Sequence, residues 1–464
     1  MPKFNYSTKL LVMKTNNLTR RKFIVNTSAG TAGALLSNHL PVFGNSNKTL
    51  ASEPAILGGN PVRTEGWMKW PVWNSDAEKP MLSVLRSGNW FRGNGHKASE
   101  FEKLYADLIG SNRAVATASG TTALETALHV MGVDAGDEVI VSPYTFIATY
   151  NVVFNQKALP VFADTDQETF NINPQKIEEK INDRTRAILP VHILGLPADM
   201  NRINSIAKKH DLVVIEDACQ AWLAEYEGEK VGTLGDLGCF SFQNSKHIPS
   251  GEGGAIVGND DKLMDLCYSY HNCGRAYGKT MSQFRGYPFR GGNKRMTELQ
   301  AVILISQIKR AKPDADKRLE NALYLDSKLK EIPGIIPYKL TEGATRSAYH
   351  LYPFRYKKEF FDDLPREKFL KALSAEGIPC SGGYGTQYHD GLMEEALSSR
   401  GYKRLFSEQR LKQYREELHN LPDNEQLTRE AVWFYQNMLL AERKDMDDII
   451  HAVQKVYDNR KQLL

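Results

Sequence analysis

Cysteine is scarce in this sequence. There are five cysteines, an odd number, and none forms a Cys-x-x-Cys pair. Structural zinc sites are commonly built on such pairs and disulfide frameworks on an even set, so neither is indicated and no metal is predicted. We interpret the cysteines as small, buried apolar side chains. Their positions are Cys219, Cys239, Cys267, Cys273 and Cys380.

An excess of one charge sign is also missing. The chain carries 59 Lys and Arg against 55 Asp and Glu, a formal net charge of +4. No basic stripe interleaved with aromatic residues occurs, so nucleic-acid binding is not predicted. The 464 residues, of which 41% are hydrophobic, are enough to bury a large core. This length predicts two or three domains.

The N-terminus has the layout of an export signal. In "LTRRKFIVNTSAGTAGALLSNHLPVF" the pair Arg20–Arg21 precedes a mildly apolar run, a pattern that resembles a twin-arginine signal. Asn26 and Asn38 make the run too short and too polar for a membrane span. We therefore predict a signal and linker over residues 1–50 and a periplasmic or extracytoplasmic location. The alternatives are a disordered basic tail and a cytoplasmic protein.

We predict a large domain over residues 51–310, in which an N-terminal arm is followed, from about Glu100, by alternating extended and helical segments. "DEVIVSP", "ALPVFADTD", "RAILPVHILG", "DLVVIEDA" and "GCFSFQ" are typical of buried strands, and "GTTALETALHVMG" and "ADMNRINSIAKKH" of helices. This alternation predicts an α/β fold with a mostly parallel sheet covered by helices on both faces. "GGAIVGND" predicts a further strand, antiparallel to its neighbour. Ligands are expected at the carboxyl ends of the strands.

The remaining residues, 311–464, predict a smaller α+β domain. "NKRMTELQAVILISQIKRA" is typical of a long amphipathic helix, and Pro313 with the charged segment after it marks a change of pattern. "AYHLYPFRYK" predicts a strand and "ERKDMDDIIHAVQKVYDN" a closing helix.

Three chemically distinct groups lie at predicted strand ends or helix starts. Ser119, Gly120 and Thr121 open a helix, whose free N–H groups suit an anion, although plain capping is the favoured interpretation of this motif taken alone. Glu216 and Asp217 end the strand "VVIED", where a buried carboxylate needs a cation or a donor. A helix cap or a salt bridge is the alternative interpretation for these carboxylates.

The third group is Lys246 in "SFQNSKHIPSGEGG". Ser241 and Lys246 follow one predicted strand, and the glycines after them, at 251, 253 and 254, allow a sharp turn before the next strand. A surface lysine is the alternative, but the two flanking strands favour an orientation into the cleft. A desolvated lysine loses its proton easily and can form a Schiff base with a carbonyl. A phosphate site, a buried carboxylate and this lysine together predict a pyridoxal 5'-phosphate site.

From about Gly58 to the C-terminus the sequence resembles the DegT/DnrJ/StrS family of sugar and cyclitol aminotransferases, within the fold-type I pyridoxal-phosphate superfamily. The resemblance rests on "SGTTALETAL", "GDEVIVSPYTFIATYN", "VHILGLPADM", "IEDACQA", "FSFQNSKHIPSGEGG" and "GGNKRMTELQA", in this order. The closing "AVWF…LLAERKDMDDIIHAVQKV" is most similar to the branch that acts on inositol-type ketones.

The resemblance implies a role for individual residues. Lys246 would form the Schiff base and move protons, Asp217 would pair with the ring nitrogen, and Gln220 would contact the ring hydroxyl. Phe146, or less favoured Tyr144, would stack on the ring. Phosphate ligands would be Gly120, Thr121, Thr122 and Ser241, with Asn293 reaching the phosphate of a partner subunit in a homodimer with shared sites.

The resemblance also selects the reaction. Relatives that are dehydratases carry a histidine at the lysine position, whereas this chain has Lys246 there and His247 beside it, which favours ping-pong transamination from glutamate or glutamine to a keto sugar or keto cyclitol such as a scyllo-inosose. A pyridoxal-phosphate-binding sensor and a sugar dehydratase are the alternatives. Pro249 departs from the threonine common in the family. An export signal is also unusual there and favours a free keto sugar or keto inositol.

The acceptor itself is not specified by the sequence. Residues 380–393, "CSGGYGTQYHDGLM", are expected to form part of the acceptor pocket from their position in the family pattern. His192 and His350 are candidates for the same pocket, with core packing as the favoured role. His247 is interpreted as a structural neighbour of Lys246.

Overall fold

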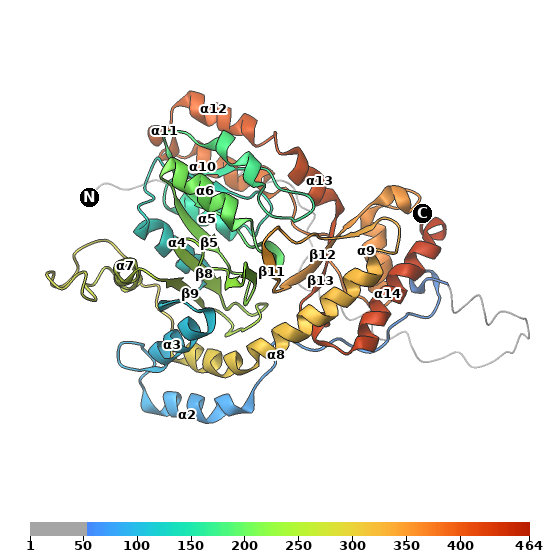
Figure 1. Ribbon diagram of the computed structural model, residues 1–464, viewed down its shortest axis with the longest axis horizontal. Coiled ribbons are helices and arrows are strands. Elements are labelled where there is room, and N and C mark those ends of the chain that lie inside the picture. Colours follow the sequence, from blue (N-terminus) through green and yellow to red (C-terminus); the bar gives the residue numbers. More distant parts are fainter. Residues whose placement is uncertain (1–52) are drawn as a thin grey trace, which may run out of the picture. The chain divides into compact units, whose positions relative to one another are not determined.

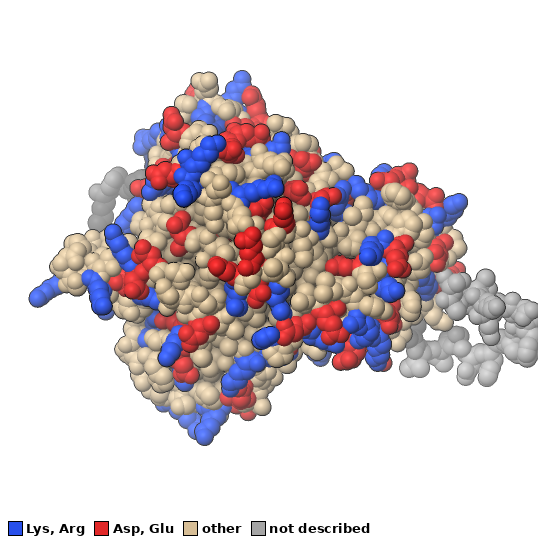
Figure 2. Space-filling model, in the orientation of Figure 1, with Lys and Arg blue, Asp and Glu red and all other residues tan. Residues whose placement is uncertain are grey.

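The computed structural model describes residues 53–464, which lie within one compact unit. The predicted twin-arginine signal lies outside the described residues, so it stays a prediction. Among the helices of the described region, none is both long and apolar enough to cross a bilayer. Basic and acidic side chains are interspersed over the face seen in Figure 2.

A seven-stranded sheet forms the centre of the described region (Figure 1). Its strands are β1 (Arg113–Thr117), β2 (Glu138–Val141), β3 (Leu159–Phe162), β4 (Thr185–Leu189), β5 (Val213–Asp217), β8 (Leu237–Ser241) and β9 (Gly254–Gly258). Their spatial order is β1-β9-β8-β5-β4-β2-β3. β9 runs antiparallel to both of its neighbours, β1 and β8, and the other neighbouring pairs in this sheet are parallel. The predicted mostly parallel sheet and the antiparallel strand at "GGAIVGND" are confirmed.

Helices cover both faces of this sheet because successive strand residues point to opposite sides. One core joins the sheet to α4 (Gly120–Val130), α5 (Ala148–Asn155), α7 (Asp261–His271), α10 (Gly391–Ser398), α11 (Tyr402–Leu405) and α12 (Glu408–Glu417). The opposite core joins it to α3 (Lys97–Ile109), α6 (Met200–His210) and the first half of α8 (Glu298–Leu329). In α4, for example, Ala123, Leu124 and Ala127 are buried against the sheet.

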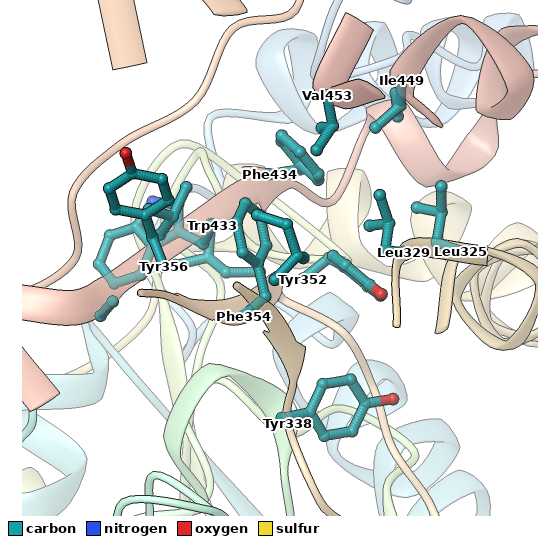
Figure 3. Close-up of a cluster of buried hydrophobic side chains, with 14 of the residues drawn as sticks. Leu325, Leu329, Tyr338, Tyr352, Phe354, Tyr356, Trp433, Phe434, Ile449 and Val453 are labelled. Atoms are coloured by element: carbon teal, nitrogen blue, oxygen red, sulfur yellow. The ribbon is translucent and has the colours of Figure 1, made fainter. Parts of the chain in front are cut away.

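Two smaller antiparallel sheets lie beside the large one. The first contains β10 (Ile335–Pro337), β12 (Leu351–Tyr356) and β13 (Ala431–Tyr435), and the second contains β6 (Glu225–Tyr226), β7 (Glu229–Lys230) and β11 (Ala344–Arg346). The remaining helices are α2 (Glu78–Ser87), α9 (Arg366–Ala375), α13 (Pro422–Glu430) and α14 (Arg443–Asp458). Figure 3 shows the apolar core where β12 and β13 meet α8 and α14, with Tyr352 and Phe434 stacked at a ring distance of 6.0 Å.

The change of pattern expected at Pro313 does not end the helix. α8 is 32 residues long, Glu298–Leu329, and passes through Pro313. A proline removes one backbone donor, but here both halves of the helix are held by packing: Ala301 and Leu304 in the core of the large sheet, Ala322 and Leu325 in the core of β12 and β13. The predicted boundary between a large and a smaller domain near residue 310 therefore lies inside a helix. The division into these domains stays a prediction.

The C-terminal part also returns to the large sheet. α10, α11 and α12 pack on it, and the hydroxyls of Tyr402 and Tyr414 donate to the carbonyls of Ala158 (2.7 Å) and Pro160 (2.6 Å) at β3. These three helices lie within residues 311–464, the range of the predicted smaller domain, but they pack against the large sheet.

Candidate active site

A cavity of about 540 Å³ opens where β5 and β8 end and α4 begins. Seven of the predicted site residues line it: Gly120, Thr121, Phe146, Asp217, Gln220, Ser241 and Lys246. The other lining residues are Ser119, Leu124, Ala148, Thr149, Cys219, Gln243, Ser245, Glu252, His350 and Tyr384. The cavity lies at the carboxyl ends of parallel strands, where the sequence predicted a ligand.

The start of α4 forms one wall of the pocket. Ser119 caps the helix by accepting from the Thr122 N–H (3.2 Å), and the Thr122 hydroxyl in turn accepts from the Ser119 N–H (3.0 Å). The side chain of Thr122 is thus used within the cap, and Thr122 is not among the pocket residues. The first N–H groups of a helix, here Gly120 and Thr121, lack partners within the helix. They remain available for an anion.

Two glycines allow this helix start to approach the strands. A Cβ atom on Gly120 would lie 2.8 Å from both Cys219 Sγ and Ser241 Cβ, and one on Gly254 would lie 2.3 Å from the Ser119 carbonyl oxygen. No larger residue fits at either position without movement. Ser241, 8% exposed at the end of β8, faces the same wall.

The two acidic residues at the end of β5 have separate surroundings. Glu216 is fully buried and accepts from the backbone N–H groups of Gly232, Leu234 and Gly235 at 2.6–2.7 Å. Its Oε2 also lies 2.8 Å from His192 Nε2. Neither Glu216 nor His192 lines the pocket, so both serve the fold.

Asp217, on the opposite side of the strand, does line the pocket. Its Oδ2 accepts from the Thr149 hydroxyl (2.9 Å) and its Oδ1 from the Cys219 N–H (3.2 Å). Burial raises the pKa of the Cys219 thiol well above its usual value, and the nearby Asp217 adds to this, so the thiol is neutral. Asp217, 5% exposed, is the buried carboxylate of the pocket.

Lys246 lies in the loop between β8 and β9. Its carbonyl accepts from Trp70 Nε1 (3.1 Å), and its Nζ lies 3.4 Å from His350 Nε2. Burial lowers the pKa of Lys246 below that of a free lysine, against the opposing effects of Cys219 and Asp217. Such an amine is neutral at a lower pH than an exposed lysine, the state that a nucleophile or base requires.

Gln220 and the aromatic residues complete the pocket. Gln220 Oε1 accepts from the Leu194 N–H (2.9 Å), and its Nε2 donates to the Tyr384 hydroxyl (3.0 Å). Phe146 is 54% exposed and lines the pocket, whereas Tyr144 is fully buried and does not. Tyr144 instead packs edge-on against Tyr384, with ring centroids 5.4 Å apart.

Several expected residues lie elsewhere. Asn293 is exposed, paired with Asn272 in an antiparallel bridge, and not among the pocket residues of this chain. Of residues 380–393, only Tyr384 lines the pocket, while Tyr388 and Met393 are buried in the core of the large sheet. His247 is buried behind Lys246 with its ring 5.6 Å from that of His350.

Sequence reasoning missed Thr149, included Tyr384 only as part of the expected acceptor segment 380–393, and favoured core packing for His350. Thr149 stands three residues after Phe146 in "TFIATYN", a helical spacing that could have indicated a shared pocket. Tyr384 and His350 come from the part of the chain after α8, far from the motifs in sequence. No local pattern indicated that they reach Lys246 and Gln220.

The sequence matches a known family along most of its length. Residues 74–454 match the DegT/DnrJ/EryC1/StrS aminotransferase family. An L-glutamine:2-deoxy-scyllo-inosose aminotransferase from Streptoalloteichus tenebrarius is 34% identical over 421 residues, covering 88% of this chain and 98% of that protein. The enzyme of the same name from Streptomyces kanamyceticus is 34% identical over 427 residues, with coverage of 88% and 98%.

Solved structures agree with the family match. An aminotransferase from Psychrobacter cryohalolentis has a TM-score of 0.74 at 31% identity, covering 85% of this chain and all (100%) of that one. A 3-amino-5-hydroxybenzoic acid synthase has a TM-score of 0.74 at 27% identity, covering 86% and 100%. The fold is that of the fold-type I transferases, and the relatives in this family use pyridoxal phosphate. The chain belongs to the DegT/DnrJ/EryC1/StrS aminotransferase family, and it is an aminotransferase.

Proposed function

We propose that this aminotransferase binds pyridoxal 5'-phosphate in the 540 Å³ pocket and transfers an amino group from glutamine or glutamate to a keto cyclitol or keto sugar. The observation that carries the proposal is the meeting of Lys246, Asp217 and the start of α4 in one cavity. The names of the relatives support the substrates, since they specify L-glutamine as donor and 2-deoxy-scyllo-inosose as acceptor.

The pocket residues fit this cofactor chemically. The N–H groups of Gly120 and Thr121, with the Ser241 hydroxyl, offer donors to a phosphate at a helix N-terminus. Thr122 supports them through the cap. Gln220 Nε2 has a second hydrogen to donate to a ring hydroxyl, and the exposed Phe146 offers an aromatic face.

When bound, pyridoxal phosphate supplies an electron-withdrawing ring that stabilises negative charge developing on the substrate carbon. Asp217 would hold the proton on the ring nitrogen, with its carboxylate oriented by Thr149 and the Cys219 N–H. Lys246 Nζ would anchor the cofactor covalently. In its free form it would remove the proton from the donor's α carbon and later deliver a proton to the carbon that receives the amino group. Donor and acceptor would react in turn at one pocket.

We propose that the active unit is a homodimer in which Asn293 reaches the partner's phosphate site. Its exposed position outside the pocket of its own chain is consistent with this role.

We also propose export, supported by Arg20, Arg21 and the apolar run after them. The twin-arginine route carries folded proteins. It would therefore allow the enzyme to bind its cofactor before export.

The decisive test is reduction of the cofactor-loaded protein with borohydride, followed by peptide mapping. A stable label on Lys246 is expected, and its absence would contradict the proposal.

The donor is tested by adding glutamine or glutamate and following the absorbance of the cofactor. The aminated enzyme is then offered 2-deoxy-scyllo-inosose, scyllo-inosose, a keto hexose and a nucleotide keto sugar separately. Reaction with the nucleotide sugar alone would contradict the proposed acceptor.

A further inference from the structure

We propose that His350 is a positioning residue for Lys246, whose free amine it holds against the pocket wall through a hydrogen bond. This rests on the proposed role of Lys246 as the residue that is covalently attached and released in each turnover. A released lysine with four rotatable bonds would otherwise sample many orientations.

The first observation is the contact itself. His350 is 6% exposed, lines the pocket, and has its Nε2 3.4 Å from Lys246 Nζ. This distance is long for a hydrogen bond. On the other side of the ring, Nδ1 has no hydrogen-bond partner among residues 53–464. The polar contact of this buried ring within the described chain is therefore the one to Lys246.

The second observation is a contrast with another buried histidine. His192 is fully buried and uses both ring nitrogens: Nδ1 accepts from the Ala198 N–H (3.0 Å), and Nε2 lies 2.8 Å from Glu216 Oε2. Both ring nitrogens of His192 are thus satisfied by the fold, and an unpaired buried polar atom destabilises a protein. His350 differs: its Nδ1 has no partner in the described chain, and its Nε2 is near Lys246 Nζ.

The third observation is how the backbone fixes His350. It precedes strand β12 and follows Tyr349, which has a positive φ of 55°. The turn at Gly195 lies close to this segment. A Cβ atom on Gly195 would be 2.6 Å from the Tyr349 backbone nitrogen and 2.9 Å from that of His350. The Gly195 carbonyl accepts from the Ala348 N–H (2.9 Å). One turn therefore sets the position of His350.

The same turn also sets Gln220, because the Leu194 N–H donates to Gln220 Oε1. Residues 193–195 thus connect two walls of the pocket that are distant in sequence: the loop after β5 and the segment before β12. Such double attachment to rigid backbone is what a precise placement of the lysine amine requires.

The charges around the contact favour a neutral imidazole. Asp217 and Cys219 face Lys246 from the end of β5, Glu252 and Tyr384 line the same cavity, and His247 and Arg318 lie behind the ring. Burial lowers the pKa of His350 well below its usual value, and Lys246, His247 and Arg318 add to this. A neutral imidazole has one nitrogen that can accept from Lys246, whereas a lysine ammonium can only donate.

The direction of the effect follows. A hydrogen bond to the charged amine is stronger than one to the neutral amine, so His350 stabilises the protonated form of Lys246 relative to an apolar residue in its place. Removal of the acceptor should therefore lower the pKa of Lys246 further. A glutamine, whose side-chain oxygen accepts, should restore it.

The test uses the full-length protein freed of cofactor, with trace acetic anhydride as the probe of each lysine and mass spectrometry as the readout. The pH midpoint of Lys246 acetylation is compared in wild type, His350→Leu and His350→Gln, with exposed Lys279 as the internal reference. His210→Gln, which changes a surface histidine beside Glu178, is the matched control. We expect the Leu variant to lower the midpoint by about one pH unit and the Gln and control variants to leave it unchanged.

An unchanged or raised midpoint in the Leu variant would overturn the proposal. If that variant does not fold, His350→Met is measured instead, because its flexible side chain fills the space without a strong acceptor. In the loaded enzyme, the Leu or Met variant should lower kcat about 10- to 100-fold with little change in KM, and Gln should recover much of the loss. A matching loss in the Gln variant would also contradict the inference. The cofactor-free titration does not depend on Lys246 being labelled by borohydride, so the two proposals fail separately.

Discussion

Glu216 and Asp217 are adjacent in strand β5 but belong to two regions with different hydrogen bonding. On one face, the Glu216 site consists of Glu216, His192 and the backbone N–H groups of Gly232, Leu234 and Gly235. Every one of these contacts is 2.8 Å or shorter. On the other face, Asp217 opens to a cavity with Lys246 and His350, whose contact is 3.4 Å long.

The difference shows how one strand end can serve both stability and chemistry. Side chains alternate between the faces of a strand, so two carboxylates in sequence face different environments. Glu216 uses both carboxylate oxygens to accept from backbone N–H groups and His192, and so holds the loop at residues 232–235 in place. Asp217 and Lys246 face a cavity, where a ligand can bind. The Glu216 site should therefore affect stability, and the pocket should affect activity.

The largest effect is expected from Lys246→Ala. Removal of the amine eliminates both the covalent anchor and the proton carrier, so transamination should fall by about 10⁴-fold or more. Thermal stability should be unchanged or slightly higher, because a desolvated lysine is removed. Activity assays and thermal denaturation test this, with Lys279→Ala as the exposed control. If Lys246→Ala lowered the thermal stability, the proposal that the pocket affects activity and the Glu216 site affects stability would be contradicted.

Asp217→Asn is expected to come next. Asparagine keeps the shape but removes the anion, so activity should fall by about 10²- to 10³-fold. The cofactor should still bind, because the phosphate donors are on α4 and at the end of β8. Steady-state kinetics and the cofactor absorbance measure the two effects. Activity near that of wild type would show that the ring nitrogen needs no anionic partner here.

Glu216→Gln should have the opposite profile. Each carboxylate oxygen accepts more than one contact, and the amide nitrogen of glutamine cannot replace either. We expect a loss of about 2–4 kcal/mol in stability, seen as a lower denaturation temperature. The residual folded enzyme should have a nearly normal kcat. The control is Glu229→Gln on the exposed β7 strand, and equal stability of the two variants would contradict this interpretation.

The smallest effect is predicted for Thr149→Val, which removes the hydroxyl that donates to Asp217 Oδ2. Loss of one hydrogen bond to a charged acceptor should lower activity by about 10-fold. Thr126→Val is the isosteric control, since the Thr126 hydroxyl donates to the Thr122 carbonyl within α4. If Thr126→Val lost more activity than Thr149→Val, the proposal that the Thr149 hydroxyl orients Asp217 would be contradicted.

The alternation of strands and helices, the antiparallel strand at residues 254–258 and the family were all predictable from the sequence. Each depends on local patterns, namely apolar periodicity and short motifs in a fixed order. The helix start at Ser119 was also predictable, because capping acts within one turn. The helix through Pro313 was not, because packing against two cores outweighs the loss of one donor.

The division of roles between Glu216 and Asp217 needed the tertiary structure. The motif "VVIED" determined that two acids end a buried strand, but only the loop at residues 232–235 and the pocket decided which acid is satisfied by backbone donors. His350 and Tyr384 likewise reach the pocket from segments more than 100 residues beyond Lys246. Local sequence determined the chemical groups near each strand end. Contacts between distant segments decided their partners, because these depend on how the chain packs and not on spacing along it.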